Sequence, residues 1–416
     1  MSKHILLTGG RLLDPRKDAL GPPTDILIED GMVKEVAEHL QAPPDASCID
    51  VRGRTVMPGL IDAHIHMFMN EMNIAALAGV PQTYATAKST MVLRQMLHRG
   101  WTTVRDVAGG DYGMRDAAEA GYIESPRLFV GGKAISQTGG HGDFRSRAVS
   151  GDDCACCTGL ALFSTLADGV PEVIKATREQ LRLGADHIKI MLSGGVASPN
   201  DPLDSIQYRV DEIAACTEEA ERWGSYVCAH AYSDLAIRRG ILNGIRCIEH
   251  GNFVSAETAA MMAERGAFVV PTLIVHEANT RLGGAASGKS PASMAKNERV
   301  RVAGLAALKV YREAGVQIGY GSDLSMHTQQ FQNEGLAFNA TVLSNADVIR
   351  SATIVNARII RREGLLGELI AGAHADLLIV DGDPYANLDV LSRHEDHILA
   401  VMQAGRFVRA DPAISP

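Results

Sequence analysis

The segment MPGLIDAHIH at residues 57–66 sets the interpretation of the whole chain. We interpret the apolar run at residues 56–64 as a buried strand, with the pair His64 and His66 where it ends. Side chains at positions i and i+2 of a strand point to the same side, so both imidazoles can face one metal ion. Most His-x-His pairs in soluble proteins are surface or packing residues. A metal site therefore needs further ligands elsewhere in the chain.

Downstream of this segment, short apolar runs alternate with helical stretches at regular intervals. Such alternation is the pattern of βα units around a parallel sheet. The expected helices include residues 170–183, 210–223 and 257–265, and the expected strands are residues 56–64, 102–107, 128–131, 187–190, 226–229, 247–249, 268–272 and 317–321. Eight units of this kind predict an α/β fold, a (β/α)8 TIM barrel.

The two ends of the chain have a different pattern of short strand-like runs separated by Gly and Pro turns. The N-terminal runs lie at residues 4–7, 25–29 and 32–36, and similar runs return at residues 375–382 and 398–406. The turn Asp30-Gly31 predicts a type I′ hairpin, which needs positive φ at both positions. Chain termini often lie close together. We therefore predict one small β-sandwich domain from residues 1–57 and 367–416, beside a barrel domain of residues 58–366.

Four further residues of metal-ligand type interrupt or end the later strands, namely Lys189, His230, His250 and Asp323. Each one alone is more simply explained as a polar residue where a strand leaves the core. Together with the His-x-His pair they occupy strands 1, 4, 5, 6 and 8, at the carboxyl face where barrel enzymes place their active sites. A lysine inside an apolar strand such as that of Lys189 is costly unless it is paired or chemically altered.

The composition excludes several other classes of protein. With 46% apolar and 21% charged residues the chain is an ordinary folded protein, and its net charge of −9 with only 5% aromatic residues argues against a nucleic-acid partner. No apolar run reaches the length of a membrane helix, and the first ten residues lack the features of a secretory signal. An odd number of cysteines, seven, suggests reduced thiols. We therefore expect a cytoplasmic protein.

The cluster Cys154, Cys156 and Cys157 is the one concentration of cysteines in the sequence. A structural zinc site would need a second nearby Cys/His pair at finger-like spacing, and none follows. We expect loop or packing thiols, and the role of the cluster stays open.

At these residues the sequence resembles the amidohydrolase superfamily, over nearly the whole chain. The resemblance is carried by MPGLIDAHIH at 57–66, Lys189, His230, IEHG at 248–251, GSD at 321–323 and GELIAGAHADL at 367–377. Within the superfamily, TGGHGD at 138–143, KIMLSGG at 189–195 and HAY at 230–232 are similar to the branch described as Xaa-Pro dipeptidase-like or imidazolonepropionase-related.

The resemblance implies a centre of two divalent metal ions, usually zinc. His64, His66 and Asp323 would bind the more buried ion, and His230 and His250 would bind the other. Imidazole and carboxylate ligands suit zinc, while manganese, cobalt and iron stay open as alternatives.

The resemblance also implies that Lys189 is carboxylated by carbon dioxide and bridges the two ions. A carbamate converts an unfavourable buried ammonium into an oxygen ligand for two metals. The two ions would lower the pKa of a bridging water and polarise a substrate carbonyl.

Three residues are candidates for catalysis and substrate binding. Asp323 would take the proton of the attacking water and deliver it to the leaving nitrogen. His141, in a Gly-rich turn after the third strand, would donate a hydrogen bond to the developing oxyanion, unless it only caps the loop. Tyr232 would project into the same opening and bind a substrate carboxylate or carbonyl, with ordinary packing as the alternative.

A substrate carboxylate would require a cation near the site. Arg145 and Arg147 are the nearest in sequence to His141, although they are equally well explained as solvated loop charges. His276 and His327 lie near strand ends and are candidates for lining the cleft.

Three functions follow from these observations. The first is a metal-dependent hydrolase that cleaves the amide bond before the C-terminal residue of dipeptides or N-acyl-amino acids, with proline as the nominal preference and Lys, Arg or aromatic residues as alternatives. The second opens a cyclic amide, as an imidazolonepropionase does. The third, a non-catalytic interaction protein, predicts lost ligands, whereas all six positions are filled. We expect a small peptide or N-acyl-amino-acid partner, no nucleic acid and no membrane, and homo-oligomerisation stays open.

Overall fold

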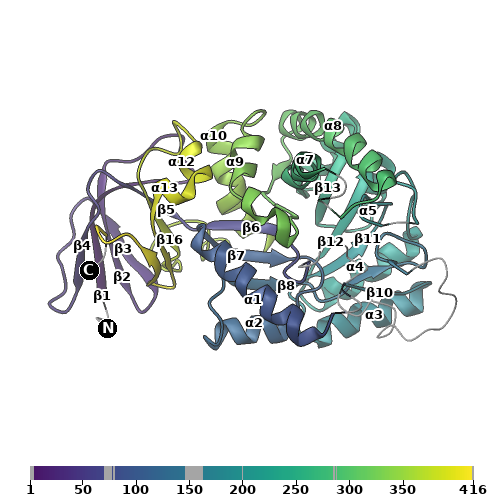
Figure 1. Cartoon of the computed structure of the whole chain (residues 1–416), viewed down its shortest axis with the longest axis horizontal. Coiled ribbons are helices and arrows are strands. Elements are labelled where there is room, and N and C mark those ends of the chain that lie inside the picture. The colour runs from purple at the N-terminus through teal and green to yellow at the C-terminus, as the bar shows by residue number, and fades with distance from the viewer. Residues whose placement is uncertain are drawn as a thin grey trace.

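A computed structural model describes residues 4–69, 77, 80–145, 163–198, 200–283, 286 and 288–414. The molecule is elongated, with a ring of strands and helices at one end and a smaller group of strands at the other (Figure 1). Within the described ranges no helix has the length and apolar character needed to cross a membrane. The cysteine cluster at residues 154–157 and the candidate Arg147 lie outside the described residues.

The larger part is a barrel of parallel strands. Its strands are β6 (Leu60–Ile65), β7 (Trp101–Asp106), β8 (Arg127–Val130), β11 (Ile188–Met191), β12 (Val227–Ser233), β13 (Cys247–Phe253), β14 (Phe268–Val270) and β15 (Gln317–Ile318), with β9 (Ala134–Ser136) and β10 (Ser164–Leu166) added beside β11. The last and first strands meet where the Ala63 amide donates to the Tyr320 carbonyl at 2.9 Å and the Asp323 amide donates to the His64 carbonyl at 2.8 Å. The predicted eightfold α/β barrel is confirmed.

Helices pack around these strands. The first group is α1 (Gln82–His98), α2 (Tyr112–Glu119), α3 (Val170–Arg182), α4 (Val210–Arg222), α5 (Asp234–Leu242), α6 (Ala256–Glu264), α7 (Leu273–Leu282) and α8 (Pro291–Ala314). After β15 follow a 3₁₀ helix (Met326–Phe331), α9 (Glu334–Asn339), α10 (Asn345–Arg350), a π-helical turn (Ser351–Val355) and α11 (Asn356–Ile359). The three helices predicted from the sequence correspond to α3, α4 and α6, with ends that differ by one residue at most.

The first barrel strand differs from its prediction. The apolar run at residues 56–64 is not one strand, because β5 (Thr55–Pro58) belongs to the small β domain and β6 begins at Leu60. Gly59 lies at the junction, where its amide donates to the Asp376 carbonyl at 2.8 Å. A Cβ on Gly59 would lie 2.1 Å from the Thr102 side chain. Because the backbone at residue 59 lies so close to the Thr102 side chain of β7, only glycine fits at this position.

Both ends of the chain build the small β domain. Its strands are β1 (His4–Leu12), β2 (Pro23–Glu29), β3 (Met32–Ala37), β4 (Ser47–Asp50), β5, β16 (Leu377–Val380), β17 (Ile398–Gln403) and β18 (Arg406–Ala410), with the short helices α12 (Asp389–Ser392) and α13 (His394–His397) between β16 and β17. The sheet order is β18-β17-β16-β5-β1-β2-β3, with β4 on β1, so N-terminal and C-terminal strands are hydrogen-bonded to each other. Figure 1 shows both termini at this end of the molecule.

The core of this small domain explains why the two ends assemble. One cluster of buried apolar side chains includes Leu7, Ile26 and Val56 from the first segment and Leu377 and Met402 from the second. Neither segment could bury these residues alone, so their apolar faces stabilise each other. The predicted hairpin is also confirmed, since φ is 51° at Asp30 and 81° at Gly31.

Candidate metal centre

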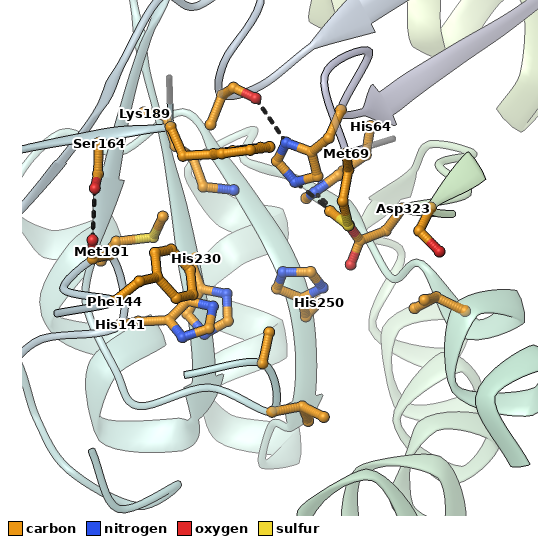
Figure 2. A pocket seen from close by; sticks show the side chains of 18 of the residues that line it. His64, Met69, His141, Phe144, Ser164, Lys189, Met191, His230, His250 and Asp323 are labelled. Atoms are coloured by element: carbon orange, nitrogen blue, oxygen red, sulfur yellow. Dashed lines mark hydrogen bonds and ion pairs between the residues drawn. The ribbon is translucent and has the colours of Figure 1, made fainter. Parts of the chain in front are cut away.

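A cavity of about 100 Å³ opens at the carboxyl ends of the barrel strands. All six predicted ligand residues line it, and so do the candidates His141 and Tyr232. Figure 2 shows His141 and His230 on one side of this cavity and Asp323 on the other, with His250 between them. The remaining lining includes apolar side chains from Met69, Ala108, Phe144, Phe163, Met191, Val196, Ala197 and Val275, and polar side chains from Ser164, His276, Asn279, Lys289 and Ser325.

The four imidazoles form a connected group. The ring centroids of His64 and His250 lie 5.0 Å apart, those of His230 and His250 lie 4.6 Å apart, and those of His64 and His66 lie 5.2 Å apart. Asp323 Oδ1 is 3.4 Å from Nε2 of His66 and 3.6 Å from Nε2 of His64. Ligand atoms of His64, His250 and Asp323 all lie within 4.8 Å of one another, so these three residues form a group that could hold a metal ion.

Each of these histidines has one ring nitrogen bound by the protein. Nδ1 of His64 lies 2.7 Å from Glu249, Nδ1 of His66 lies 2.8 Å from the Ala108 carbonyl, and Nδ1 of His250 lies 2.7 Å from Thr272 Oγ1. In His230 the nitrogen bound by the protein is Nε2, which lies 3.1 Å from the Gly194 carbonyl, so Nδ1 is the nitrogen left for a metal ion. Metal-binding histidines are held in this way by an outer partner on the second nitrogen. The donor set therefore fits divalent metal ions.

The outer partner of His64 is part of a buried chain of charges. Arg105 Nη2 lies 2.6 Å from Glu249 Oε1, and Arg105 Nε donates to the Ala63 carbonyl at 2.6 Å. Burial alone would raise the pKa of Glu249, but the Arg105 guanidinium and the His64 hydrogen bond lower it below its ordinary value. Burial lowers the pKa of His64 to about 4, so its imidazole is neutral near pH 7, as a metal ligand must be.

The backbone of the site is strained at three residues. The φ angles of His250, Thr272 and Asp323 are 75°, 47° and 53°, in the left-handed region that non-glycine residues seldom adopt. Such conformations cost on the order of 1–3 kcal/mol each and cluster at functional sites. Two of the three residues are predicted ligands, and the third holds Nδ1 of His250.

Lys189 lies within β11 and is 2% exposed. It lines the same cavity as the histidines, and within the described part of the chain no carboxylate lies in ion-pair distance of its ammonium. An unpaired buried ammonium is costly. Conversion of Lys189 to the predicted carbamate would remove this cost, because the carbamate carries no ammonium charge.

His141 stacks on His230, with the ring centroids 4.1 Å apart. Its Nδ1 lies 2.7 Å from Ser198 Oγ. When the Ser198 hydroxyl donates this hydrogen bond, Nε2 carries the proton of the neutral ring and can donate. Burial lowers the pKa of His141 to about 4, against the charge of Asp201, so the imidazole is neutral near pH 7. Tyr232 is buried, with its ring centroid 5.1 Å from that of His250.

Of the two arginines expected near His141, only Arg145 is among the described residues. Arg145 does not line it, because its guanidinium is bound at 2.8 Å and 2.7 Å by the two carboxylate oxygens of Asp143. His276 does line the cavity, whereas His327 does not. Lys289 lines it as well, and sequence reasoning missed this residue because it follows a loop far from the other candidates in the chain.

Comparison with known proteins agrees with this geometry. The amidohydrolase family matches residues 55–408. The chain is similar to a crystal structure of an amidohydrolase, with 45% identity and a TM-score of 0.95 over 98% of this chain and 100% of the other. It is also similar to a prolidase solved in complex with N-methylphosphonate-L-proline, with 42% identity, a TM-score of 0.95 and the same coverage. Ochratoxinase from Aspergillus niger is 28% identical over 87% of this chain and 77% of its own length.

The chain therefore belongs to the amidohydrolase family. It is a hydrolase that acts on amide or peptide bonds, and the resemblance seen in its sequence is confirmed.

Proposed function

We propose that the protein hydrolyses the amide bond before the C-terminal residue of dipeptides or N-acyl-amino acids, at a centre of two divalent metal ions. The observation that carries this proposal is the convergence of four imidazoles, a carboxylate and an unpaired buried lysine on one cavity. The similarity to a prolidase that binds N-methylphosphonate-L-proline supports a substrate that ends in proline or another amino acid with a free carboxylate.

One ion would be held by His64, His66 and Asp323, and the other by His230 and His250. Zinc fits these donors best, and manganese, cobalt and iron are the alternatives. Bound there, the ions would polarise the substrate carbonyl and lower the pKa of a water molecule.

Lys189 would contribute an oxygen ligand to both ions. Its amine forms a bond with the carbon of carbon dioxide and loses a proton, which gives a carbamate. The unpaired, 2% exposed ammonium of Lys189 supports this role, because the carbamate replaces its positive charge with a negative one beside the metals.

Asp323 would accept the proton of the attacking water and pass it to the leaving nitrogen. Burial opposes ionisation of Asp323, but its position beside the imidazoles of His64 and His66 holds its pKa below the ordinary value, so the carboxylate is ionised and able to accept a proton. On the other side of the cavity, His141 would donate from Nε2 to the oxyanion that develops on the carbonyl oxygen.

A substrate panel with the metal-loaded protein tests the proposal. It contains Xaa-Pro, Xaa-Lys/Arg and Xaa-aromatic dipeptides, N-acyl-amino acids and cyclic amides. We expect hydrolysis of dipeptides or N-acyl-amino acids, abolished by Asp323→Asn and unaffected by Asp204→Asn, which changes an exposed aspartate paired with Arg299. Turnover of cyclic amides alone would replace this proposal with the ring-opening activity.

Lys189→Ala tests the bridging role separately. We expect loss of bound metal and of turnover, whereas Lys309→Ala, on the exposed face of α8, should retain both. Full metal content and full activity in Lys189→Ala would refute the carbamate.

A further inference from the structure

Lys289 projects from the connection between α7 and α8 to the active-site cavity. It directly precedes Ser290, whose hydroxyl caps α8 by accepting a hydrogen bond from the Ser293 amide at 3.1 Å. Pro291 follows at the first helical position. A capped helix start with proline at this position has a well-defined backbone. The lysine is therefore anchored next to a rigid element.

The ammonium of Lys289 has no protein partner in the described part of the chain. The residue is partly buried, and none of the ion pairs or hydrogen bonds among described residues includes it. Burial lowers the pKa of Lys289, and the charge of Asp323 opposes this shift. Placing a cation where water is partly excluded is unfavourable unless an anion compensates it. A partly buried ammonium without a protein partner at the cavity therefore indicates a binding position for a negatively charged group of a ligand.

Lys289 lines the cavity together with Asp323 and His276. The charge of Lys289 acts on His276, and the charge of Asp323 acts on Lys289. Tyr232 lies between the two sides of the cavity, with its ring centroid 4.8 Å from that of His230 and 6.2 Å from that of His276. His141 and His230 lie on the opposite side of the view from Asp323 in Figure 2.

The position of Asp323 determines which part of the substrate lies beside this carboxylate. In the proposed function, Asp323 delivers a proton to the leaving nitrogen, so the leaving amino acid must lie beside it. The α-carboxylate of that amino acid is only two bonds from the nitrogen. The carboxylate therefore lies near Asp323, in the cavity that Lys289 also lines.

We propose that Lys289 binds the free carboxylate of the leaving amino acid and selects substrates that have one. This inference rests on the proposed function and adds the residue that requires a free C-terminus. Lys289 would also be the cation that a substrate carboxylate requires. The sequence favours Arg145 for this role, but Asp143 already binds the Arg145 guanidinium.

Kinetics with paired substrates test this role in the metal-loaded protein. A dipeptide that the wild type hydrolyses is compared with its C-terminal carboxamide, in the wild type, Lys289→Met, Lys289→Arg and the control Lys309→Met. Loss of a charge-assisted hydrogen bond should raise KM for the free acid roughly 10- to 100-fold in Lys289→Met, with kcat changed much less. The carboxamide should be unaffected, and Lys289→Arg should retain most of the preference for the acid.

Binding provides a second readout that does not depend on turnover. Calorimetry with the free amino acid that would be released, L-proline for an Xaa-Pro substrate, should show weaker binding to Lys289→Met than to the wild type and to Lys309→Met. Equal loss for acid and carboxamide, or an unchanged ratio between them, would overturn the role of Lys289. If no dipeptide or N-acyl-amino acid is hydrolysed by the wild type, the proposed function fails, and unchanged amino-acid binding in Lys289→Met then also overturns the present inference.

Discussion

Glu249→Gln removes the charge that links His64 to Arg105 while it keeps nearly the same shape. All three side chains are buried, and Glu249 accepts from Arg105 at 2.6 Å and from His64 at 2.7 Å. The substitution leaves a guanidinium buried without its counter-charge. It also weakens the outer partner that fixes the orientation and tautomer of His64.

The expected loss of stability follows from this burial. Breaking a buried ion pair by removing one partner costs about 3–5 kcal/mol. For a chain of 416 residues, an unfolding entropy of about 2.1 cal/mol/K per residue converts this loss into a lower Tm by about 3–6 °C. Loss of an outer partner of a metal ligand typically lowers metal affinity by about 10- to 100-fold.

Thermal unfolding in a chelator measures the loss of stability, and titration of the metal-free protein with zinc measures the loss of metal affinity. Glu257→Gln is the matched control, because Glu257 is 76% exposed and its pair with Arg238 lies on the surface. An exposed pair contributes at most about 1 kcal/mol. A metal-free Glu249→Gln protein that unfolds within about a degree of wild type and binds zinc equally well would refute the reasoning.

The sign of the pH dependence provides a further check on the same variant. The pKa of Glu249 lies below its ordinary value in the folded protein. Its stabilising contribution is therefore present above the unfolded pKa of about 4.3 and is lost as the pH falls toward the folded value. The difference in stability between wild type and Glu249→Gln should narrow in acid.

Three further predictions concern other parts of the structure. Ser198→Ala removes the partner of His141 Nδ1 and should lower kcat up to about tenfold with little change in KM, measured by steady-state kinetics. An alkylating reagent at pH 8 should label exposed Cys48 in the native protein but not Cys228, which is buried and whose pKa is raised by burial to about 12, as mass spectrometry can establish. Gly59→Ala should destabilise the protein by about 1–3 kcal/mol in denaturant unfolding, because its Cβ has no space.

Controls make these three outcomes decisive. Ser205→Ala, in the same loop, should keep wild-type kcat, and an unchanged kcat in Ser198→Ala would contradict the role given to His141. Gly113→Ala adds a methyl group in α2 where the nearest atom is 3.4 Å away, and should not destabilise. Labelling of Cys228 as fast as Cys48 would contradict its burial.

The barrel could be predicted from sequence because each strand is a short apolar run and the predicted ligands interrupt or end these runs. The junction at Gly59 could not, since the apolar pattern continues from one domain into the other and periodicity alone does not show where hydrogen bonding changes sheets. Glu249 and Arg105 meet across 144 residues, and the only sequence signal is a charged residue inside an apolar strand.

The residues around the substrate were harder to predict than the metal ligands. Nearness in sequence to His141 favours Arg145 as the cation, yet Asp143, closer still in the chain, binds its guanidinium. Lys289 reaches the cavity only through the packing of α7 and α8 against the barrel, so its distance along the chain conceals it. Proximity in sequence is a weak guide for side chains that come from loops.

The metal content of the purified protein tests the central claim most directly. Elemental analysis of protein produced with zinc in the medium should give about two ions per chain for the wild type and for Lys309→Ala, and at most about half of that for Lys189→Ala. Wild-type protein without bound transition metal that hydrolyses its substrate fully in the presence of a chelator would contradict the account.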